Sequence, residues 1–184
     1  MSYDPDKHHR RSIRLKGYDY RRSGAYFVTV CTKDREMIFG DIVEGTMLLN
    51  RPGECAAQSW EWLGRRHDRV SLDAWIIMPN HLHGVIIFDD RTEGGSRTAP
   101  TPSKEKPLGR RIGAFKTLST KRINQIRGTP ETPVWQRNYY EHVIRDENEL
   151  NRIRTYIEAN PAMWDMDDEN PAAMSRRNEP GDIS

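Results

Sequence analysis

The stretch VSLDAWIIMPNHLHGVIIF, residues 70–88, decides the fold. Its two halves are rich in β-branched and other apolar residues, and Pro79-Asn80 between them is a turn signal. We therefore predict two strands joined as a hairpin. Because successive side chains of a strand point to opposite faces, His81 and His83 should share one face of this hairpin.

The segments around the hairpin alternate between strand and helix patterns. Short β-branched or aromatic runs predict strands, and apolar residues three or four apart predict helices. Asp146 followed by Glu149 resembles a capping box, and Pro161 stops the helix that begins there. The predicted elements are, in order, strand 25–32, a short extra hairpin over 42–49, helix 54–66, strands 70–78 and 81–88, helix 108–127, a strand or strand-like segment over 134–144, and a last helix to about Asn160.

This order of elements gives the fold class. Apart from the short extra hairpin, the first six elements have the βαββαβ arrangement of a ferredoxin-like sandwich, an α+β fold with an antiparallel sheet and helices on one face. The seventh element, the last helix, could cover the open face of the sheet. We expect a basic arm at residues 1–24, one folded domain at 25–164 with a flexible loop at 89–106, and an acidic, disordered tail at 165–184.

Charge is distributed unevenly along the 184 residues. Residues 1–145 hold 25 Lys and Arg against 17 Asp and Glu, whereas residues 146–184 hold 4 against 10. A basic body favours a polyanionic partner, although an ordinary solvated surface explains the imbalance nearly as well. No apolar run is long enough to span a bilayer, and the basic N-terminus lacks the apolar stretch of a secretory signal. We therefore expect a cytoplasmic protein that has no membrane partner.

The two histidines of the hairpin are candidate metal ligands. Two imidazoles at the rim of a sheet can hold a metal ion, although an isolated His-x-His pair often arises by chance on an exposed sheet face. On the last helix, Tyr156 and Asn160 lie four residues apart and so on one side, beside the apolar packing stripe. Taken alone, that pair is explained better as a core-edge tyrosine and a helix-ending asparagine.

Two motifs resemble a known family. MPNHLHGVI, residues 78–86, resembles the His-hydrophobe-His signature of the HUH nucleases. WQRNYYEHVIRD at residues 135–146, followed by YIEANP at 156–161, is similar to the single-tyrosine transposases and most of all to the REP-associated tyrosine transposases. The resemblance covers about residues 10–164. The shared order and spacing of the motifs make it stronger than either motif alone.

The resemblance implies a metal-dependent, transposase-like enzyme that nicks and rejoins single-stranded DNA. It assigns His81 and His83 as metal ligands, Asn160 as a third ligand, and Tyr156 as the nucleophile that forms a 5′-phosphotyrosine intermediate. The ion would be magnesium or manganese. An all-neutral donor set binds manganese more tightly, and the missing fourth protein ligand argues against a structural zinc site.

The substrate that the resemblance implies is hairpin-forming, repetitive extragenic DNA, bound by a monomer or a homodimer. Cations of the arm and of the acid-free helix at 108–127 could contact phosphates, and a tryptophan could stack on an unpaired base. A solvated helix face and a core tryptophan are the alternatives. The candidate DNA-binding residues are Arg10, Arg11, Arg14, Lys16, Arg110, Arg111, Lys116, Lys121, Arg122 and Trp135.

Other interpretations stay open at this point. Tyr139 and Tyr140 are rival nucleophiles by residue type, but they precede the last helix and lack the YIxxNP context. A non-catalytic nucleic-acid-binding module on a ferredoxin-like sheet is a second function, although the central hairpin offers histidines and aliphatic residues instead of stacking aromatics. A third is a metal-dependent phosphodiesterase that uses water as nucleophile, with Tyr156 in a structural role.

Overall fold

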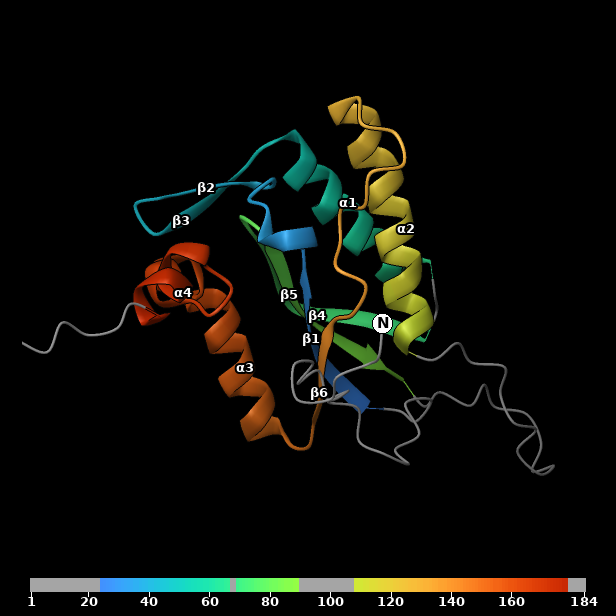
Figure 1. Cartoon of the computed structure of the whole chain (residues 1–184). Coiled ribbons are helices and arrows are strands. Elements are labelled where there is room, and N and C mark those ends of the chain that lie inside the picture. Colours follow the sequence, from blue (N-terminus) through green and yellow to red (C-terminus); the bar gives the residue numbers. More distant parts are fainter. Residues whose placement is uncertain (1–23, 67–68, 90–107, 179–184) are drawn as a thin grey trace, which may run out of the picture.

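The computed structural model describes residues 24–66, 69–89 and 108–178. Figure 1 shows a central sheet with α1 and α2 on one side and α3 on the other. The elements are β1 (Gly24–Cys31), the short 3-10 helix η1 (Lys33–Arg35), β2 (Gly40–Val43), β3 (Thr46–Leu49), α1 (Arg51–Arg65), β4 (Val70–Met78), β5 (His81–Phe88), α2 (Leu108–Arg127), β6 (Tyr140–Ile144), α3 (Glu147–Ala159), the 3-10 helix η2 (Pro161–Met166) and α4 (Pro171–Asn178).

The main sheet has the strand order β4-β5-β1-β6, and every neighbouring pair is antiparallel. The predicted hairpin is formed by β4 and β5, and β1 lies between β5 and the edge strand β6. This is a ferredoxin-like βαββαβ arrangement, which confirms the predicted fold class. The predicted extra hairpin is present as a separate two-stranded ribbon of β2 and β3.

The larger hydrophobic core lies between the sheet and the helices α1 and α2. Leu82 and Ile86 of β5 point into it, and Trp60 of α1 meets Phe115 of α2 edge to face. Gly84 makes room for the tryptophan, because a Cβ atom there would lie 2.6 Å from the indole. Burial of each large apolar side chain contributes roughly 1.5–3 kcal/mol, so this layer supplies most of the hydrophobic stabilisation.

The opposite face of the sheet is covered by α3, as predicted for the last helix. Phe27 and Val85 of the sheet pack against Leu150 and Ile157 of the helix in a second, smaller cluster. The helix begins where the capping box predicts, since Oδ1 of Asp146 accepts a 2.8 Å hydrogen bond from the Glu149 amide. This face carries the histidine pair, so the cluster also fixes how α3 approaches it.

An ion pair and a histidine–carboxylate contact hold α3 across the sheet. Arg154 donates from Nε and Nη2 to the two carboxylate oxygens of Asp73 on β4, each at 2.8 Å. Glu149, near the start of the helix, lies 2.8 Å from Nε2 of His142 on β6. Because β4 and β6 are the two edges of the sheet, α3 is fastened at both of them. Side chains between these two points reach the central strands.

Two element boundaries differ from the prediction. Helix α1 begins at Arg51 and not at Glu54, because Oδ1 of Asn50 caps it by accepting a hydrogen bond from the Gly53 amide. The segment predicted as a strand or strand-like from 134 forms a continuous strand only in β6, from Tyr140. Before it, Trp135 forms an isolated bridge with Thr32, the Gln136 amide donates to the Cys31 carbonyl at 2.9 Å, and Lys116 of α2 binds the carbonyls of residues 136–138.

The prediction of a disordered tail from residue 165 is wrong as far as residue 178. Residues 161–166 form η2 and 171–178 form α4. Asp167 and Asn170 between them are buried. Contacts with residues far away in the sequence hold this acidic segment in place. For example, Nε of Arg35 donates a 2.7 Å hydrogen bond to Oε2 of Glu169.

Some predicted features cannot be compared with the structure. The basic arm and the loop at 89–106 lie outside the described residues, apart from Gly24 and Asp89, and so do residues 179–184. Among the helices that are described, none is both long and apolar enough to cross a membrane.

Candidate active site

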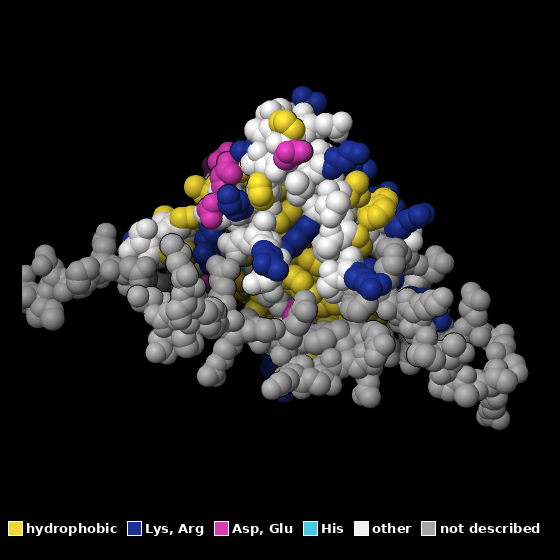
Figure 2. Space-filling view, turned by 45° about the vertical axis from the view of Figure 1, so that its right-hand side comes forward, with side chains coloured by type: hydrophobic (Ala, Val, Ile, Leu, Met, Phe, Trp, Pro, Cys, Tyr) yellow, Lys and Arg dark blue, Asp and Glu magenta, His cyan; other side chains and the backbone are white. Residues whose placement is uncertain are grey.

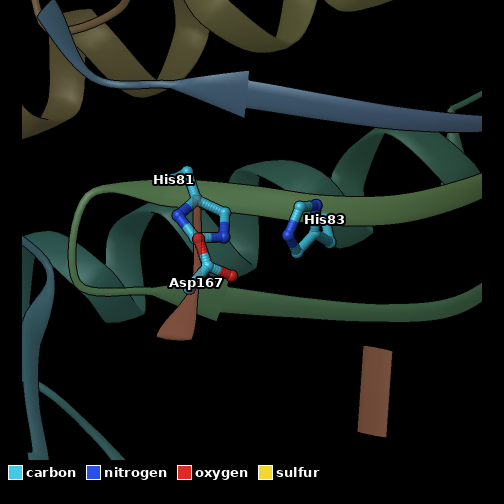
Figure 3. A group of neighbouring side chains, drawn as sticks. All are labelled: His81, His83 and Asp167. Carbon is cyan, nitrogen blue, oxygen red and sulfur yellow. The ribbon is translucent and has the colours of Figure 1, made fainter. Parts of the chain in front are cut away.

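His81 and His83 lie at the start of β5, on the sheet face that α3 covers. The strand alternation places both imidazoles on that face, and their ring centroids are 4.4 Å apart. Both side chains are buried, with 0% and 3% of their surface exposed. Figure 3 shows the two rings side by side, with the Asp167 carboxylate against His81.

Asn80 fixes the tautomer of His81. The amide nitrogen Nδ2 of Asn80 donates to the Glu169 carbonyl at 2.7 Å, so its Oδ1 must be the atom that faces Nδ1 of His81 at 2.9 Å. An amide oxygen only accepts, which places the proton of the neutral ring on Nδ1 and leaves a lone pair on Nε2. Burial, together with the positive charge of Arg35, lowers the pKa of His81 to about 3.

Thr29 and Tyr156 hold His83 from two sides. The Thr29 hydroxyl lies 2.9 Å from Nδ1, and the Tyr156 hydroxyl lies 3.1 Å from Nε2. Burial, with the neighbouring His81 as a second cause, lowers the pKa of His83 well below its ordinary value. Both imidazoles are therefore neutral at pH 7 and can offer Nε2 as a ligand atom.

Tyr156 reaches the histidines from α3, as the spacing on the last helix predicts. The residue is 47% exposed, and its hydroxyl contacts Nε2 of the buried His83. Its ring lies 5.2 Å from that of His83, centroid to centroid. Desolvation and the carboxylates of Asp167 and Asp168 raise the pKa of Tyr156 to about 12, while a hydrogen bond with Asn160 acts in the opposite direction. The phenol therefore needs a nearby positive charge to become a good nucleophile near neutral pH.

Asp167 is a candidate metal ligand that the sequence analysis missed, since it assigned the residue to a disordered tail. It is 8% exposed. One ligand atom from each of His81, His83 and Asp167 lies within 4.8 Å of the others. The sequence signal for this ligand was an acidic residue seven positions after Asn160, and that spacing alone is weak evidence for a metal ligand.

Two buried atoms at this site fit a divalent cation. His81 Nε2 and Asn160 Oδ1 have no hydrogen-bond partner, and leaving such buried atoms unpaired costs roughly 1–3 kcal/mol each. Asn160 Nδ2 donates to Asp167 Oδ2 at 2.9 Å, which leaves the Oδ1 atom of the amide as the one available to an ion. Two neutral imidazoles, a carboxylate and an amide oxygen form a plausible donor set for magnesium or manganese. Asn160 therefore stays a predicted ligand, beside Asp167.

The predicted DNA-binding residues divide into several groups. Arg10, Arg11, Arg14 and Lys16 lie outside the described residues. Arg110 and Lys121 are exposed on α2, whereas Arg111 and Arg122 are half-buried. Figure 2 shows Lys and Arg side chains spread over this side of the molecule, while most of the acidic ones lie toward its left margin. A hollow of about 850 Å³ separates α2 from residues 128–137, and Lys121 and Arg137 are among its lining residues.

The structure contradicts the stacking role predicted for Trp135. Its side chain is only 6% exposed, packs in the larger core, and donates from Nε1 to the Ser119 hydroxyl at 2.8 Å. So little of the residue is exposed that the indole serves as a core side chain. Lys116 is also engaged within the protein, since its ammonium donates to the carbonyls of Gln136, Arg137 and Asn138 at 2.8–3.4 Å.

The two rival tyrosines lie on opposite faces of the chain. Tyr139 packs against the larger core, and Lys116 Nζ lies 5.5 Å from its ring centroid. Tyr140 is on the face of the active site, 39% exposed, with its ring 6.2 Å from that of Phe27. Of the three tyrosines, Tyr156 is the one whose hydroxyl meets a histidine in the described contacts.

Similar proteins were found by sequence and by structure. The chain is 41% identical to an uncharacterised protein of Haemophilus influenzae over 174 residues, which are 90% of this chain and 95% of the relative. A second protein of that bacterium, predicted to be a REP-associated tyrosine transposase, is 26% identical over 151 residues, 78% of this chain and 73% of that protein. No protein-family model matches the sequence.

A solved structure of a REP-associated tyrosine transposase bound to a REP hairpin has the same fold. The TM-score is 0.51 at 19% identity, and the superposition covers 80% of this chain and 74% of the other. At this identity the likeness concerns the arrangement of helices and strands.

Proposed function

We propose that the chain is a member of the REP-associated tyrosine transposase family and that it cuts and rejoins single-stranded DNA through a covalent bond between Tyr156 and a 5′ phosphate. The observation that carries the proposal is the contact of the nucleophile with the histidine pair. Tyr156 Oη lies 3.1 Å from Nε2 of His83, although 73 positions separate the two residues. A partly exposed tyrosine whose hydroxyl meets a buried, neutral imidazole supports attack by the tyrosine over a structural role.

The proposed step exchanges one phosphate ester for another. Oη of Tyr156 forms a bond to phosphorus while the bond from phosphorus to the 3′ oxygen breaks. The phenol loses a proton and the 3′ oxygen gains one, so no water is consumed. Because the phosphotyrosine is itself a phosphodiester, a 3′-hydroxyl can attack it and join the strand again without a nucleotide cofactor.

Four residues would hold the divalent ion of this reaction: His81, His83, Asp167 and Asn160. The ion would polarise the scissile phosphate and stabilise the negative charge that develops on it. Asp167 changes which ion the residues suit. Two imidazoles and an amide favour manganese, whereas a carboxylate is the hard oxygen ligand that magnesium prefers.

We further propose hairpin DNA as the substrate, bound by a monomer or a homodimer. The relative of known structure is described as bound to a REP hairpin, and the exposed cations on α2 can contact phosphates. Arg110 and Lys121 are the exposed members of that set. Since Trp135 is buried, base stacking must come from other residues.

A labelled single-stranded oligonucleotide tests the proposal directly. A panel of oligonucleotides with and without hairpins is incubated with the full chain and manganese, and the products are separated on a denaturing gel. We expect a protein–DNA adduct that carries the 5′ phosphate of the downstream fragment, together with a free 3′-hydroxyl on the upstream one. Absence of an adduct across the panel would contradict the proposal.

The Tyr156→Phe variant separates the alternatives, and Tyr140→Phe is its matched control. The proposed mechanism predicts that Tyr156→Phe abolishes the adduct and retains metal binding, whereas Tyr140→Phe behaves as the wild type. A phosphodiesterase that uses water would continue to cut after the Tyr156 change. A non-catalytic binding module would cut in neither protein.

A further inference from the structure

The exposed ring of Tyr140 lies in register with the candidate active site. Thr29 of β1 pairs with His83 of β5 on one side and with Tyr140 of β6 on the other. Directly paired residues of neighbouring strands point to the same face of a sheet. The three side chains therefore form a row across the sheet, from the histidine at its centre to the tyrosine at its edge.

Phe27 connects this tyrosine with the catalytic groups. Its ring centroid lies 6.2 Å from that of Tyr140, at an interplanar angle of 67°. The same phenylalanine stacks on His83 at 5.4 Å and 29°, and meets Tyr156 at 6.1 Å and 82°. The aromatic surface is therefore continuous from the edge strand to the nucleophile. Phe27 is 9% exposed, so the accessible rings of this surface are those of Tyr140 at one end and Tyr156 at the other, which are 39% and 47% exposed.

The core does not explain the position of Tyr140. At 39% exposure, this ring stays partly in water at a sheet edge, whereas its neighbour Tyr139 packs into the larger core. Unpaired bases stack on such rings in proteins that bind single-stranded nucleic acid, since every base has a π face. A strand whose phosphate lies at Tyr156 has its neighbouring base within reach of this surface.

We propose that Tyr140, backed by Phe27, is a stacking platform for the unpaired base next to the scissile phosphate. The proposal rests on the proposed function and adds to it the subsite that orients the strand. The aromatic ring, and not the phenolic hydroxyl, does the binding. Tyr140 is thus a substrate-binding residue and takes no part in the bond exchange.

The test uses oligonucleotides that carry 2-aminopurine, whose fluorescence is quenched by stacking, at each position in turn. Binding is measured in the Tyr156→Phe background, which cannot cut. We expect quenching at a position adjacent to the break that the wild type makes, and the same quenching after Tyr140→Phe. Tyr140→Ala and Tyr140→Leu should abolish it and weaken binding roughly 5- to 150-fold, the range expected for one lost stacking contact.

Two controls keep the result specific. Ile126→Ala removes an apolar side chain of similar exposure, 42%, from α2 on the other side of the sheet, and should change neither quenching nor affinity. Tyr140→Leu keeps apolar bulk against Phe27, so loss of quenching in a variant with wild-type thermal stability reports the missing ring. Unchanged quenching in Tyr140→Leu, or equal damage from Tyr140→Phe, would overturn the platform.

Failure of the platform and failure of the proposed function give different results. If the wild type forms no adduct, the proposed function fails. Quenching that depends on Tyr140 can still be scored, because the scan covers every position. If the adduct forms but no position is quenched through Tyr140, the platform alone is wrong. A partner protein on this ring would instead leave all the DNA measurements unchanged by Tyr140→Ala, which also refutes the platform.

Discussion

Asn80 connects the imidazole of His81 with the backbone of Glu169. Its Oδ1 lies 2.9 Å from Nδ1 of the histidine, and its Nδ2 donates to the Glu169 carbonyl at 2.7 Å. One buried amide therefore sets the tautomer of a ligand and anchors the segment that carries Asp167. The turn that joins β4 and β5 thus organises two of the candidate metal ligands.

Replacing Asn80 should weaken metal binding without touching a ligand. Asn80→Ala removes the acceptor that orients His81 and the donor that holds Glu169, and losses of such orienting groups typically reduce metal affinity 10- to 100-fold. Titration calorimetry with manganese measures the effect. Thr29→Val tests the equivalent contact on His83 and should also lower affinity. Unchanged affinity in both variants would show that the imidazoles need no orienting partner.

Asp167 and Asn160 can be ranked as ligands by the same titration. We expect Asp167→Ala to lower magnesium affinity by roughly 100-fold or more, exceeding the effect of losing a group that only orients a ligand. Asn160→Ala should cost less, because a neutral amide oxygen contributes no charge to the site. Asp165→Ala, an exposed acidic position on η2, is the control. If Asp167→Ala and Asp165→Ala bind magnesium with equal affinity, the Asp167 carboxylate is not a metal ligand.

The ion pair between Asp73 and Arg154 should stabilise the protein in a pH-dependent way. Hydrogen bonds from Arg154 lower the pKa of Asp73 below its ordinary value of 3.8. A carboxylate with a lowered pKa contributes stability above that value and loses it as the pH falls through the lower, folded-state value. Asp73→Asn should therefore lower the melting temperature by roughly 2–4 °C at pH 7, with a smaller difference near pH 3.

Thermal unfolding followed by circular dichroism at both pH values checks this prediction. Glu147→Gln is the control, since this carboxylate also contacts Arg154 but is 72% exposed. It should leave the melting temperature nearly unchanged. An Asp73→Asn variant that melts like the wild type at pH 7 would show that this pair does not hold α3 against the sheet.

Substitutions of Trp135 and Lys121 should distinguish a residue that stabilises the fold from a residue that binds DNA. Trp135→Ala removes a buried core side chain and should lower the free energy of unfolding by roughly 3–5 kcal/mol. Lys121→Ala, at an exposed position, should change stability by less than about 0.5 kcal/mol. It should instead weaken DNA binding and reduce the slope of log affinity against log salt by about 0.9. Denaturant titration and binding at several salt concentrations measure the two effects. If Trp135→Ala were as stable as the wild type but bound DNA weakly, the predicted stacking role of Trp135 would be supported after all.

The sequence predicts the sheet well because its signals there are local. Alternating apolar residues, the Pro79-Asn80 turn and the Asp146 cap each act within a few positions, and the structure confirms the elements they predict. Strand alternation also placed the two histidines on one face. Tyr156 could be placed because its position relative to the apolar stripe of α3 follows from helical geometry alone.

Local patterns could not predict the segment around Asp167. Its residues carry no apolar periodicity, and their order comes from distant partners: Arg35 binds Glu169, and Asn160 binds Asp167. The prediction that Trp135 stacks on a base is wrong for a related reason. An aromatic residue in an irregular segment can be a core or a surface residue, and its burial depends on how α2 and β1 meet around it.

The candidate metal ligands are far apart in the order of synthesis. A ribosome completes the two histidines about halfway through the chain and reaches Asp167 only near the end of the described residues. A premature stop or frameshift after the codon of Phe88 and before that of Asp167 would leave the whole β4–β5 hairpin encoded but remove the carboxylate. Decay of the gene from its 3′ end would therefore remove a candidate ligand before it erased the sheet.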